Sequence, residues 1–155
     1  GENVCRLRES RIEEIRRERI GFIFQGFNLI PELDATENVM LPLKYKGIGK
    51  RERLKMAEKA LEAVGLAERM NHKPSEMSGG QQQRTAIARA IAGNPEIILA
   101  DEPTGNLDTD SGNQIMGIIT DLKRQGRTII LITHDNNIAH CADRIICISD
   151  GKLIV

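Results

Sequence analysis

The chain of 155 residues is poor in aromatic side chains and carries no excess of charge of either sign. Aromatic residues make up 3% of the sequence, tryptophan is absent, and 22 basic side chains balance 22 acidic ones. Proteins that bind nucleic acid usually present a basic surface, with aromatic rings that stack on bases. The composition therefore argues against a nucleic-acid partner. The 40% hydrophobic content suffices for about one domain.

The sequence also lacks long apolar runs and paired cysteines. No apolar stretch approaches the roughly 18 residues that a membrane-spanning helix needs, so any membrane association would require a partner. Cys5, Cys141 and Cys147 are odd in number and form no C-x-x-C pair, as is typical of reduced thiols in a cytoplasmic protein. His140 beside Cys141 has no metal-ligand spacing, so we expect these side chains to pack rather than to bind a metal.

A third absence concerns phosphate binding. The sequence contains no G-x-x-x-x-G-K-[ST] run, the loop whose backbone amides cradle nucleotide phosphates in many NTPases. Two other segments, 77–84 and 97–103, nevertheless carry the residue types of a nucleotide site. The sequence therefore contains some of the residues of a nucleotide-binding site but not its phosphate-binding loop.

The segment from Ile97 to Ala100 is a short unbroken apolar run rich in β-branched residues, which predicts a strand buried on both faces. Asp101 and Glu102 follow at its carboxyl end, where ligands bind to open parallel sheets. One carboxylate can hold Mg²⁺, and the next can orient or deprotonate a water that attacks a terminal phosphate. A lone Asp-Glu-Pro is more often a simple turn, so the neighbouring motifs decide between the two interpretations.

Ser78 and Gln81 form a capping-box pattern ahead of an alanine-rich helix, which we expect from Gly79 to Ala92. Gly79 and Gly80 leave the first-turn amides unshielded at the positive end of the helix dipole, a favourable position for an anion. Each glycine costs roughly 1 kcal/mol of helix stability relative to alanine, and an ordinary cap gains nothing from the pair. The two glycines therefore indicate close approach of a phosphate to the backbone.

Gln25 and His134 also follow predicted strands, at 20–24 and 128–132. The carboxyl ends of parallel strands meet at one edge, so we expect both side chains to lie near the two carboxylates. There the Gln25 carbonyl can ligate Mg²⁺ or the attacking water, and His134 can donate to a phosphate oxygen. Either residue alone would more often be a polar turn residue, but their common location favours function.

The remaining pattern alternates helices with strands, which predicts a parallel sheet with right-handed crossovers. A capping box from Ser10 to Glu13 predicts a charged helix to about Arg19. A helix at 50–64 would place four apolar residues on one face: Leu54, Ala57, Leu61 and Val64. The other expected elements are a helical segment near 35–41, a helix at 109–125, a short helix after 135, a strand at 144–148 and a hairpin turn at 150–151 into 152–155.

In this combination the motifs resemble those of the nucleotide-binding subunits of ATP-binding-cassette transporters. They stand in that family's order: the Q-loop glutamine at Gln25, the signature motif at Ser78 to Gln81, Walker B at Ile97 to Asp101, the D-loop at Asn106 to Asp108 and the switch histidine at His134. Two longer segments are similar in sequence to members of the lipoprotein-release and macrolide-export branch: E-R-I-G-F-I-F-Q-G-F-N-L-I-P-E-L and L-A-D-E-P-T-G-N-L-D. The resemblance covers essentially the whole chain.

This resemblance implies a fold and two cofactors. The fold is α/β, a P-loop NTPase-like parallel sheet with an inserted helical subdomain. Residues 1–25 and 93–155 would form part of the RecA-like core, and residues 26–92 the helical subdomain with the signature motif. The cofactors would be ATP and Mg²⁺.

The resemblance also implies roles for the site residues. Glu102 would be the catalytic base and His134 the sensor of the γ-phosphate, with Asp101 and Gln25 on Mg²⁺. Asp108 would contribute to the nucleotide site and also cap the helix at 109–125. The signature residues would bind the nucleotide from a second subunit: Ser78, Gly79, Gly80 and Gln81.

Two partners are implied in the same way. A second nucleotide-binding domain would face this one head to tail, and a transmembrane permease subunit would dock on the surface at 25–42. The apolar run at 27–31 suits that contact, and it suits packing within its own subdomain equally well. The chain would be cytoplasmic, held at the inner face of the cytoplasmic membrane by its partner.

The family places its Walker A loop and several strands ahead of the point that corresponds to Gly1. We therefore expect an incomplete sheet and a C-terminal fragment that does not hydrolyse ATP by itself. One function is that of an ABC transporter ATPase, whose intact form couples ATP hydrolysis to transport or extrusion. The alternative is a non-catalytic truncated module that docks a complete ATPase or a membrane subunit.

Overall fold

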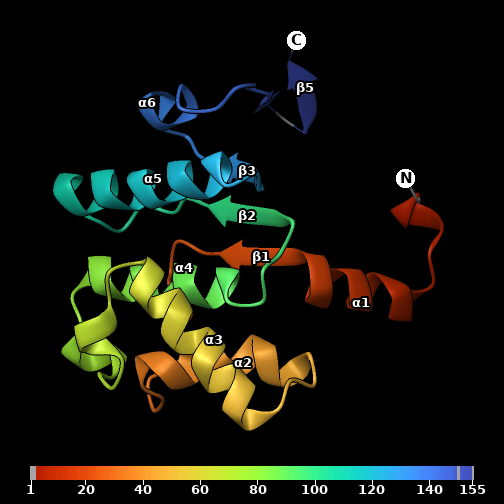
Figure 1. The fold of residues 1–155 in the computed structure, drawn as a ribbon. Coiled ribbons are helices and arrows are strands. Elements are labelled where there is room, and N and C mark those ends of the chain that lie inside the picture. The colour runs from red at the N-terminus through yellow and green to blue at the C-terminus, as the bar shows by residue number, and fades with distance from the viewer. Residues whose placement is uncertain (1–2, 150, 155) are drawn as a thin grey trace.

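The computed structural model describes residues 3–149 and 151–154. A three-stranded parallel sheet in the order β1-β2-β3 lies at its centre, and a separate β4-β5 hairpin lies near the C-terminus (Figure 1). In chain order the elements are η1 (Val4–Arg6), α1 (Glu9–Arg19), β1 (Ile20–Ile23), α2 (Ala35–Tyr45), α3 (Lys50–Ala63), η2 (Ala67–Arg69), η3 (Pro74–Glu76), α4 (Gly79–Ile91), β2 (Ile97–Asp101), α5 (Thr109–Arg124), β3 (Thr128–Ile132), α6 (Asn136–Ala139), β4 (Cys147–Ser149) and β5 (Lys152–Ile154). No helix among the described residues is long and apolar enough to cross a bilayer.

The strand register aligns the carboxyl ends of the three parallel strands. Ile23 of β1 pairs with Ala100 of β2, which pairs in turn with Leu131 of β3. The β1-β2 ladder stops at that level, whereas the β2-β3 ladder continues to Asp101 and Ile132. The loops that follow the strands therefore leave the sheet from one edge.

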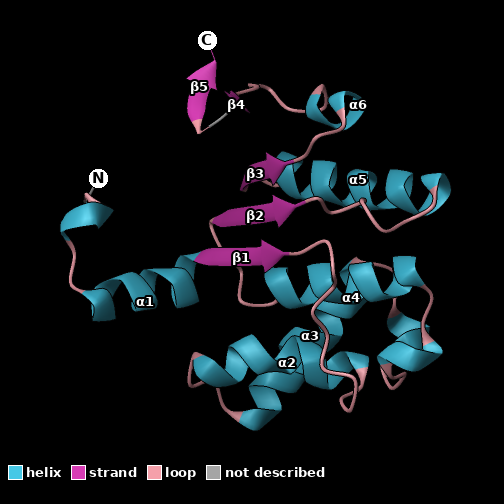
Figure 2. Ribbon diagram, turned by 180° about the vertical axis from the view of Figure 1, so that it is seen from behind, coloured by secondary structure: helices cyan, strands magenta, loops and turns pink. Residues whose placement is uncertain are grey.

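The two faces of the sheet differ in how they are covered. On β2, Ile98 and Ala100 are fully buried on the face that packs against α4 and α5. Ile97 and Leu99 point to the other face and are only partly buried, and Ile130 of β3 is 47% exposed. Figure 2 looks onto this second face, and within the described ranges no helix lies over it. The prediction that β2 is buried on both faces was therefore wrong.

Helix α4 connects the helical part of the chain to the sheet. It packs against α2 and α3 on one side and against β1 on the other. Its approach to β1 depends on Gly21, because a Cβ there would lie 2.5 Å from the carbonyl oxygen of Ala90. The predicted subdomain boundaries at residues 26 and 92 stay a prediction, since α4 contacts both parts.

Three local predictions in the helices need correction. The capping box at Ser10 was wrong: the helix begins at Glu9, and its N-cap is Arg8, whose side chain makes no capping bond. The segment near 35–41 is longer than expected, because α2 continues through Pro42 to Tyr45. Leu54, expected on the buried face of α3, is 42% exposed, while Ala57 and Leu61 are buried.

The C-terminal strand differs from its prediction in position. β4 spans Cys147–Ser149 rather than 144–148, and it pairs antiparallel with β5 in a separate two-stranded sheet. The expected hairpin is present, and Gly151 in its turn has a positive φ of 73°. The predicted turn residue Asp150 and the last residue, Val155, lie outside the described residues.

Candidate functional site

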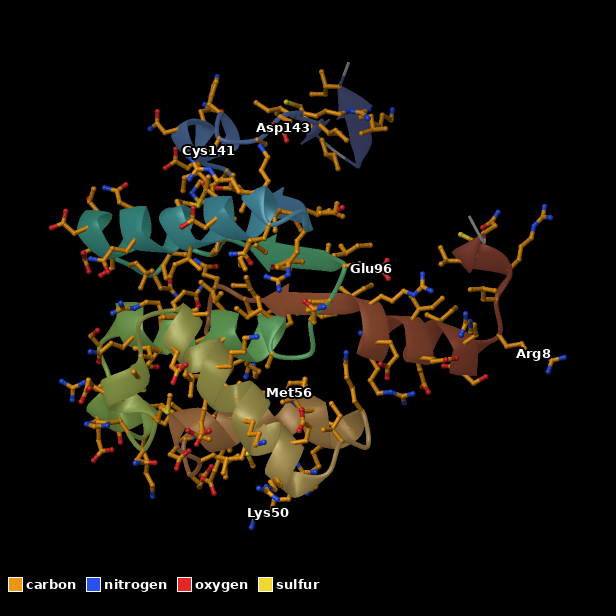
Figure 3. All side chains as sticks on the ribbon, in the orientation of Figure 1. Arg8, Lys50, Met56, Glu96, Cys141 and Asp143 are labelled. Atoms are coloured by element: carbon orange, nitrogen blue, oxygen red, sulfur yellow. The ribbon has the colours of Figure 1, made fainter. Side chains whose placement is uncertain are left out.

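The residues that the sequence places after the strands meet at the carboxyl edge of the sheet. Gln25 is the second residue after β1, Asp101 ends β2 and Glu102 comes next, and His134 is the second residue after β3. Glu96, labelled in Figure 3, lies at the opposite, amino end of β2. The convergence expected from the sequence is therefore present, although it does not by itself assign a role to any of these side chains.

Glu102 and His134 are in direct contact. The Nδ1 atom of His134 lies 2.6 Å from a carboxylate oxygen of Glu102, and the His134 backbone N–H donates to the same oxygen at 2.9 Å. The Thr133 hydroxyl donates to the other carboxylate oxygen at 3.3 Å. The Glu102 side chain is 19% exposed and that of His134 is 86% exposed. The carboxylate is therefore mostly covered, and the imidazole faces solvent.

These bonds set the protonation of Glu102. Partial burial alone would raise the pKa of this carboxyl, but the hydrogen bonds from the His134 side chain and backbone, with a smaller one from Thr133, outweigh it. The net effect is a pKa below the ordinary value of 4.5, so Glu102 is ionised at neutral pH. An ionised hydrogen-bond acceptor of fixed orientation therefore lies at this edge of the sheet.

The backbone of Glu102 is also unusual. Its φ is 44°, in the left-handed region that side-chain-bearing residues seldom adopt. The surrounding main chain enforces this conformation, because the Glu102 N–H donates to the Ile132 carbonyl at 2.9 Å and its carbonyl accepts from Gly105 at 3.1 Å. Strained residues of this kind are concentrated at functional sites.

Asp101 and Gln25 offer the oxygen atoms expected for Mg²⁺. The Asp101 side chain is exposed and makes no hydrogen bond or ion pair with any residue in 3–149 or 151–154. Gln25 exchanges hydrogen bonds with Asn106: its Nε2 donates to Asn106 Oδ1 at 3.4 Å, and Asn106 Nδ2 donates to the Gln25 backbone carbonyl at 3.1 Å. The Gln25 Oε1 atom is left as an acceptor.

The oxygen atoms of Asp101 and Gln25 are the type of donor that Mg²⁺ takes in proteins. The described part of the chain holds no cluster of three or more His, Cys, Asp or Glu side chains with metal-binding geometry. Mg²⁺ keeps several waters and takes one or two protein oxygens together with substrate phosphates, so a dedicated protein cage is not required. Asp101 and Gln25 match that requirement in number and in atom type.

The start of α4 is capped as the sequence predicts. Gln81 N–H donates to Ser78 Oγ at 3.3 Å, and Ser78 N–H donates to Gln81 Oε1 at 3.0 Å. Ser78 is exposed, but Gly80 is buried. A Cβ on Gly80 would lie 2.9 Å from Ser111 Oγ, so this glycine is needed for packing against α5. The inference that a structural cap gains nothing from the second glycine was wrong.

Asp108 performs the local role expected of it. Its carboxylate accepts from the Ser111 backbone N–H at 2.9 Å and from the Ser111 hydroxyl at 2.8 Å, which caps α5. These two bonds lower the pKa of Asp108 below its ordinary value of 3.8. A role in nucleotide binding stays a prediction.

Sequence reasoning missed three buried or partly buried polar side chains that hold the site loops. Gln83 and Arg89 of α4 donate to main-chain carbonyls of the loop around Gln25, and Gln83 also donates to the Pro103 carbonyl. Asn38 of α2 bonds the main chain between Ile30 and Asp34. A signal was available for Gln83, because it lies at the spacing of the apolar stripe of α4, where a polar residue must find a partner. The loop partners themselves could not be read from spacing.

Comparisons with known proteins agree with this geometry. The family described as ABC transporter matches residues 3–105, more than half of the chain. An uncharacterized ABC transporter ATP-binding protein of Bacillus subtilis, YknY, is 51% identical over 154 residues, which is 99% of this chain and 67% of that protein. The macrolide export ATP-binding/permease protein MacB of Wolinella succinogenes is 52% identical over 153 residues, which is 99% of this chain and 24% of MacB.

A solved structure shows the same fold at similar identity. The ATP-binding cassette MJ0796, in a dimeric post-hydrolysis state bound to ADP and Pi, superposes with a TM-score of 0.83 and 48% sequence identity. The match covers 96% of this chain and 66% of that one. The chain thus spans about two thirds of the cassette proteins and about a quarter of MacB.

The α/β fold with its parallel sheet, the order of the motifs and the matched relatives lead to one assignment. The chain belongs to the ABC transporter family, as part of an ATP-binding domain of the macrolide-export-like branch.

Proposed function

We propose that this chain forms most of the ATP-binding subunit of an ABC transporter, which couples ATP binding and hydrolysis to transport or extrusion across a membrane. The observation that carries the proposal is the contact between Glu102 and His134 at the edge shared with Asp101 and Gln25. Four groups with complementary roles in phosphoryl transfer come from three strands that are far apart in the sequence.

Each of these side chains has a proposed role. Glu102, ionised and held by His134, orients and deprotonates the attacking water. Asp101 and the Oε1 of Gln25 hold Mg²⁺, which neutralises charge on the phosphates when it is bound. The exposed His134 ring donates a hydrogen bond to a γ-phosphate oxygen as charge develops there.

The signature residues act on a nucleotide held by a second copy. Ser78 is exposed at the N-terminus of α4, where unpaired amides and the helix dipole favour an anion. Ser78, Gly79 and Gly80, together with Gln81, would close over the γ-phosphate in a head-to-tail dimer, with Asp108 near the same interface. The dimeric state of the MJ0796 cassette supports this arrangement.

A membrane partner is the second part of the proposal. MacB is named as a combined ATP-binding and permease protein, which supports a permease as the partner of this chain as well. The surface at 25–42 would receive it, since Ile30 there is 40% exposed and the loop is held by Asn38. The chain would then lie at the inner face of the cytoplasmic membrane through this contact.

The test compares ATP turnover by two proteins. One is this chain alone, and the other is the same chain extended ahead of Gly1 with the Walker A-bearing part of a relative such as YknY. We expect no Mg²⁺-dependent turnover from the chain alone, because its sequence has no phosphate-gripping loop. We expect turnover from the extended chain, lost in its Glu102→Gln variant.

Each outcome has a definite meaning. Hydrolysis by the bare chain that depends on Glu102 would show that residues 1–155 suffice for turnover and would overturn the fragment interpretation. An extended chain that binds ATP but does not hydrolyse it would favour the alternative, a non-catalytic module that docks a complete ATPase or a membrane subunit.

A further inference from the structure

The main chains that follow β1 and β2 separate just where the candidate catalytic residues begin. The ladder between these strands ends at the pair Ile23 and Ala100. Beyond it, Phe24 leads to Gln25, and Pro103 follows Glu102. Backbone pairing between the two strands no longer fixes the spacing of these segments, so side chains must set it. Asn106 contributes on the exposed side through its hydrogen bonds with Gln25.

The carboxamide of Gln83 bridges the two segments. Its Nε2 donates to the Pro103 carbonyl at 2.6 Å and to the Phe24 carbonyl at 3.4 Å. Both partners are acceptors, so the NH₂ end of the amide must face them. One side chain of α4 therefore bonds the main chain next to Gln25 and the main chain next to Glu102.

The complete burial of Gln83 indicates that its amide does more than fill the core. The side chain is 0% exposed, and its Oε1 atom has no hydrogen-bond partner among the residues that the structure describes. A buried acceptor without a partner destabilises a fold, so an apolar side chain of the same size would suit this core position better for packing alone. The amide has a use besides filling space.

Arg89 secures the other side of the same loop. Its guanidinium donates to the Phe27 carbonyl at 2.7 Å and also to the carbonyl of Asn28. Phe27 and Asn28 both have left-handed backbones, with φ of 59° and 51°. Gln83 and Arg89 thus hold the segment 24–28 to α4 on both sides of Gln25, and only Gln83 also reaches the segment that carries Glu102.

We propose that Gln83 is a positioning residue for ATP hydrolysis, which fixes Glu102 relative to Gln25 and to the signature helix. This inference rests on the proposed function. The Gln83 side chain is fully buried, and it acts through the main chain at Pro103, one residue from the left-handed Glu102. Loss of the bridge leaves the carboxylate present but displaced, and misplacement of a catalytic group by about 1 Å can cost on the order of 100-fold in rate.

The test uses Gln83→Met in the extended chain, because methionine keeps the length and volume of glutamine without its donors. We expect kcat to fall about 10- to 100-fold while the Kd for ATP changes less than about twofold. Turnover is expressed per ATP-binding site titrated, so a loss of folded protein does not imitate the effect. Thr85→Val is the control, since Thr85 is equally buried on α4 and donates to Gln81 within its own helix. Its kcat should stay within about twofold of the parent.

A second measurement separates positioning from a general weakening of the domain. In the Glu102→Gln background the base is already gone, so adding Gln83→Met should leave ATP-induced dimerisation and its ATP midpoint unchanged. Loss of dimerisation in that double variant would show that Gln83 supports the signature helix rather than Glu102, and would overturn the inference. So would an unchanged kcat in Gln83→Met.

The same experiments distinguish failure of the proposed function from failure of the inference about Gln83. If the extended parent does not hydrolyse ATP, or if Glu102→Gln retains full turnover, the role of Glu102 is wrong and the inference about Gln83 falls with it. If the parent is active, Glu102→Gln is inactive and Gln83→Met equals the parent, the inference about Gln83 alone is wrong.

Discussion

Gly80 of α4 and Ser111 of α5 approach so closely that a Cβ on residue 80 would lie 2.9 Å from the Ser111 hydroxyl and 3.1 Å from its Cβ. The hydroxyl cannot simply rotate away, because it donates to Asp108 at 2.8 Å. Gly79, by contrast, would place a Cβ no closer than 3.4 Å to any neighbour, in ordinary contact with Leu107. The two signature glycines therefore have different structural reasons to be glycine.

Gly80→Ala should lower the free energy of unfolding by about 1 kcal/mol, because overpacking against Ser111 outweighs the gain in helix propensity. Gly79→Ala should leave it unchanged or raise it by up to about 1 kcal/mol. Urea denaturation of the purified proteins gives both values. Ser111→Gly should remove most of the Gly80→Ala penalty, and a penalty that persists in that background would contradict the contact.

Stability below pH 4.5 should depend on Glu102. Its pKa is lower in the folded chain than the ordinary 4.5, so the unfolded state binds more protons between those two values, and stability rises with pH there. The contribution is complete above about pH 5 and is lost as the pH falls through the folded pKa. Glu102→Gln should therefore flatten the loss of unfolding free energy as the pH falls below about 5. Parallel curves for both proteins would mean that the hydrogen bonds with His134 do not form.

The cap of α5 offers a test of the Asp108 contacts. Asp108→Ala removes the acceptor of both Ser111 bonds and should cost about 1 kcal/mol of unfolding free energy, whereas Asp108→Asn should cost only a few tenths. Asp110→Ala serves as the control, because Asp110 is exposed in the same turn and its side chain makes no hydrogen bond or ion pair with any residue in 3–149 or 151–154. Thermal or urea unfolding measures all three, and equal losses for Asp108→Ala and Asp110→Ala would rule out a specific cap.

Arg89 should not be replaceable by lysine. Burial lowers the pKa of Arg89 below its ordinary value, yet the guanidinium stays charged and donates to two carbonyls at once. The ammonium group of lysine lacks the planar arrangement of N–H donors that lets a guanidinium bond two carbonyls at once. Arg89→Lys should therefore cost about 1 to 3 kcal/mol of unfolding free energy. Amide hydrogen exchange should rise first in residues 26–34.

The matched control for this change is Arg84→Lys on the same helix. Arg84 makes no hydrogen bond or ion pair within 3–149 and 151–154, so its replacement should change the stability by less than about 0.5 kcal/mol. Equal effects of the two substitutions would refute a special role for Arg89.

Glu102→Gln in the extended chain should separate ATP binding from hydrolysis. Glutamine keeps the shape of the side chain but cannot act as a base, so ATP should still bind while turnover falls by about 100-fold or more. The ATP-bound state should then accumulate as a stable dimer, detectable by size-exclusion chromatography with Mg²⁺ and ATP. A variant that stays monomeric with ATP bound would argue against the proposed head-to-tail assembly.

Local features were predicted well because they depend on residues close in the sequence. The Ser78 and Gln81 cap, the Asp108 cap and the apolar run of β2 all appear at their expected positions. The prediction at Ser10 also rested on nearby residues, but it failed. Its pattern allowed a cap, but the extended residue that serves as N-cap is Arg8, and the helix starts at Glu9.

The sequence also determined the order of the motifs and the edge at which they meet. A residue that follows a parallel strand leaves the sheet at its carboxyl edge, so Gln25, Glu102 and His134 were bound to come together once the strands were correctly placed. The family could also be recognised from the sequence, since the residues of these segments and the spacing between them are characteristic of it.

Only the tertiary structure decided which side chains touch. It set the hydrogen bonds between Glu102 and His134, placed Ser111 against Gly80 and gave the Gln83 amide its two carbonyl partners. It also left one face of β2 partly open. Such contacts join residues far apart in the chain, and they depend on how the helices cross the sheet. The periodicity of a single segment does not determine that crossing.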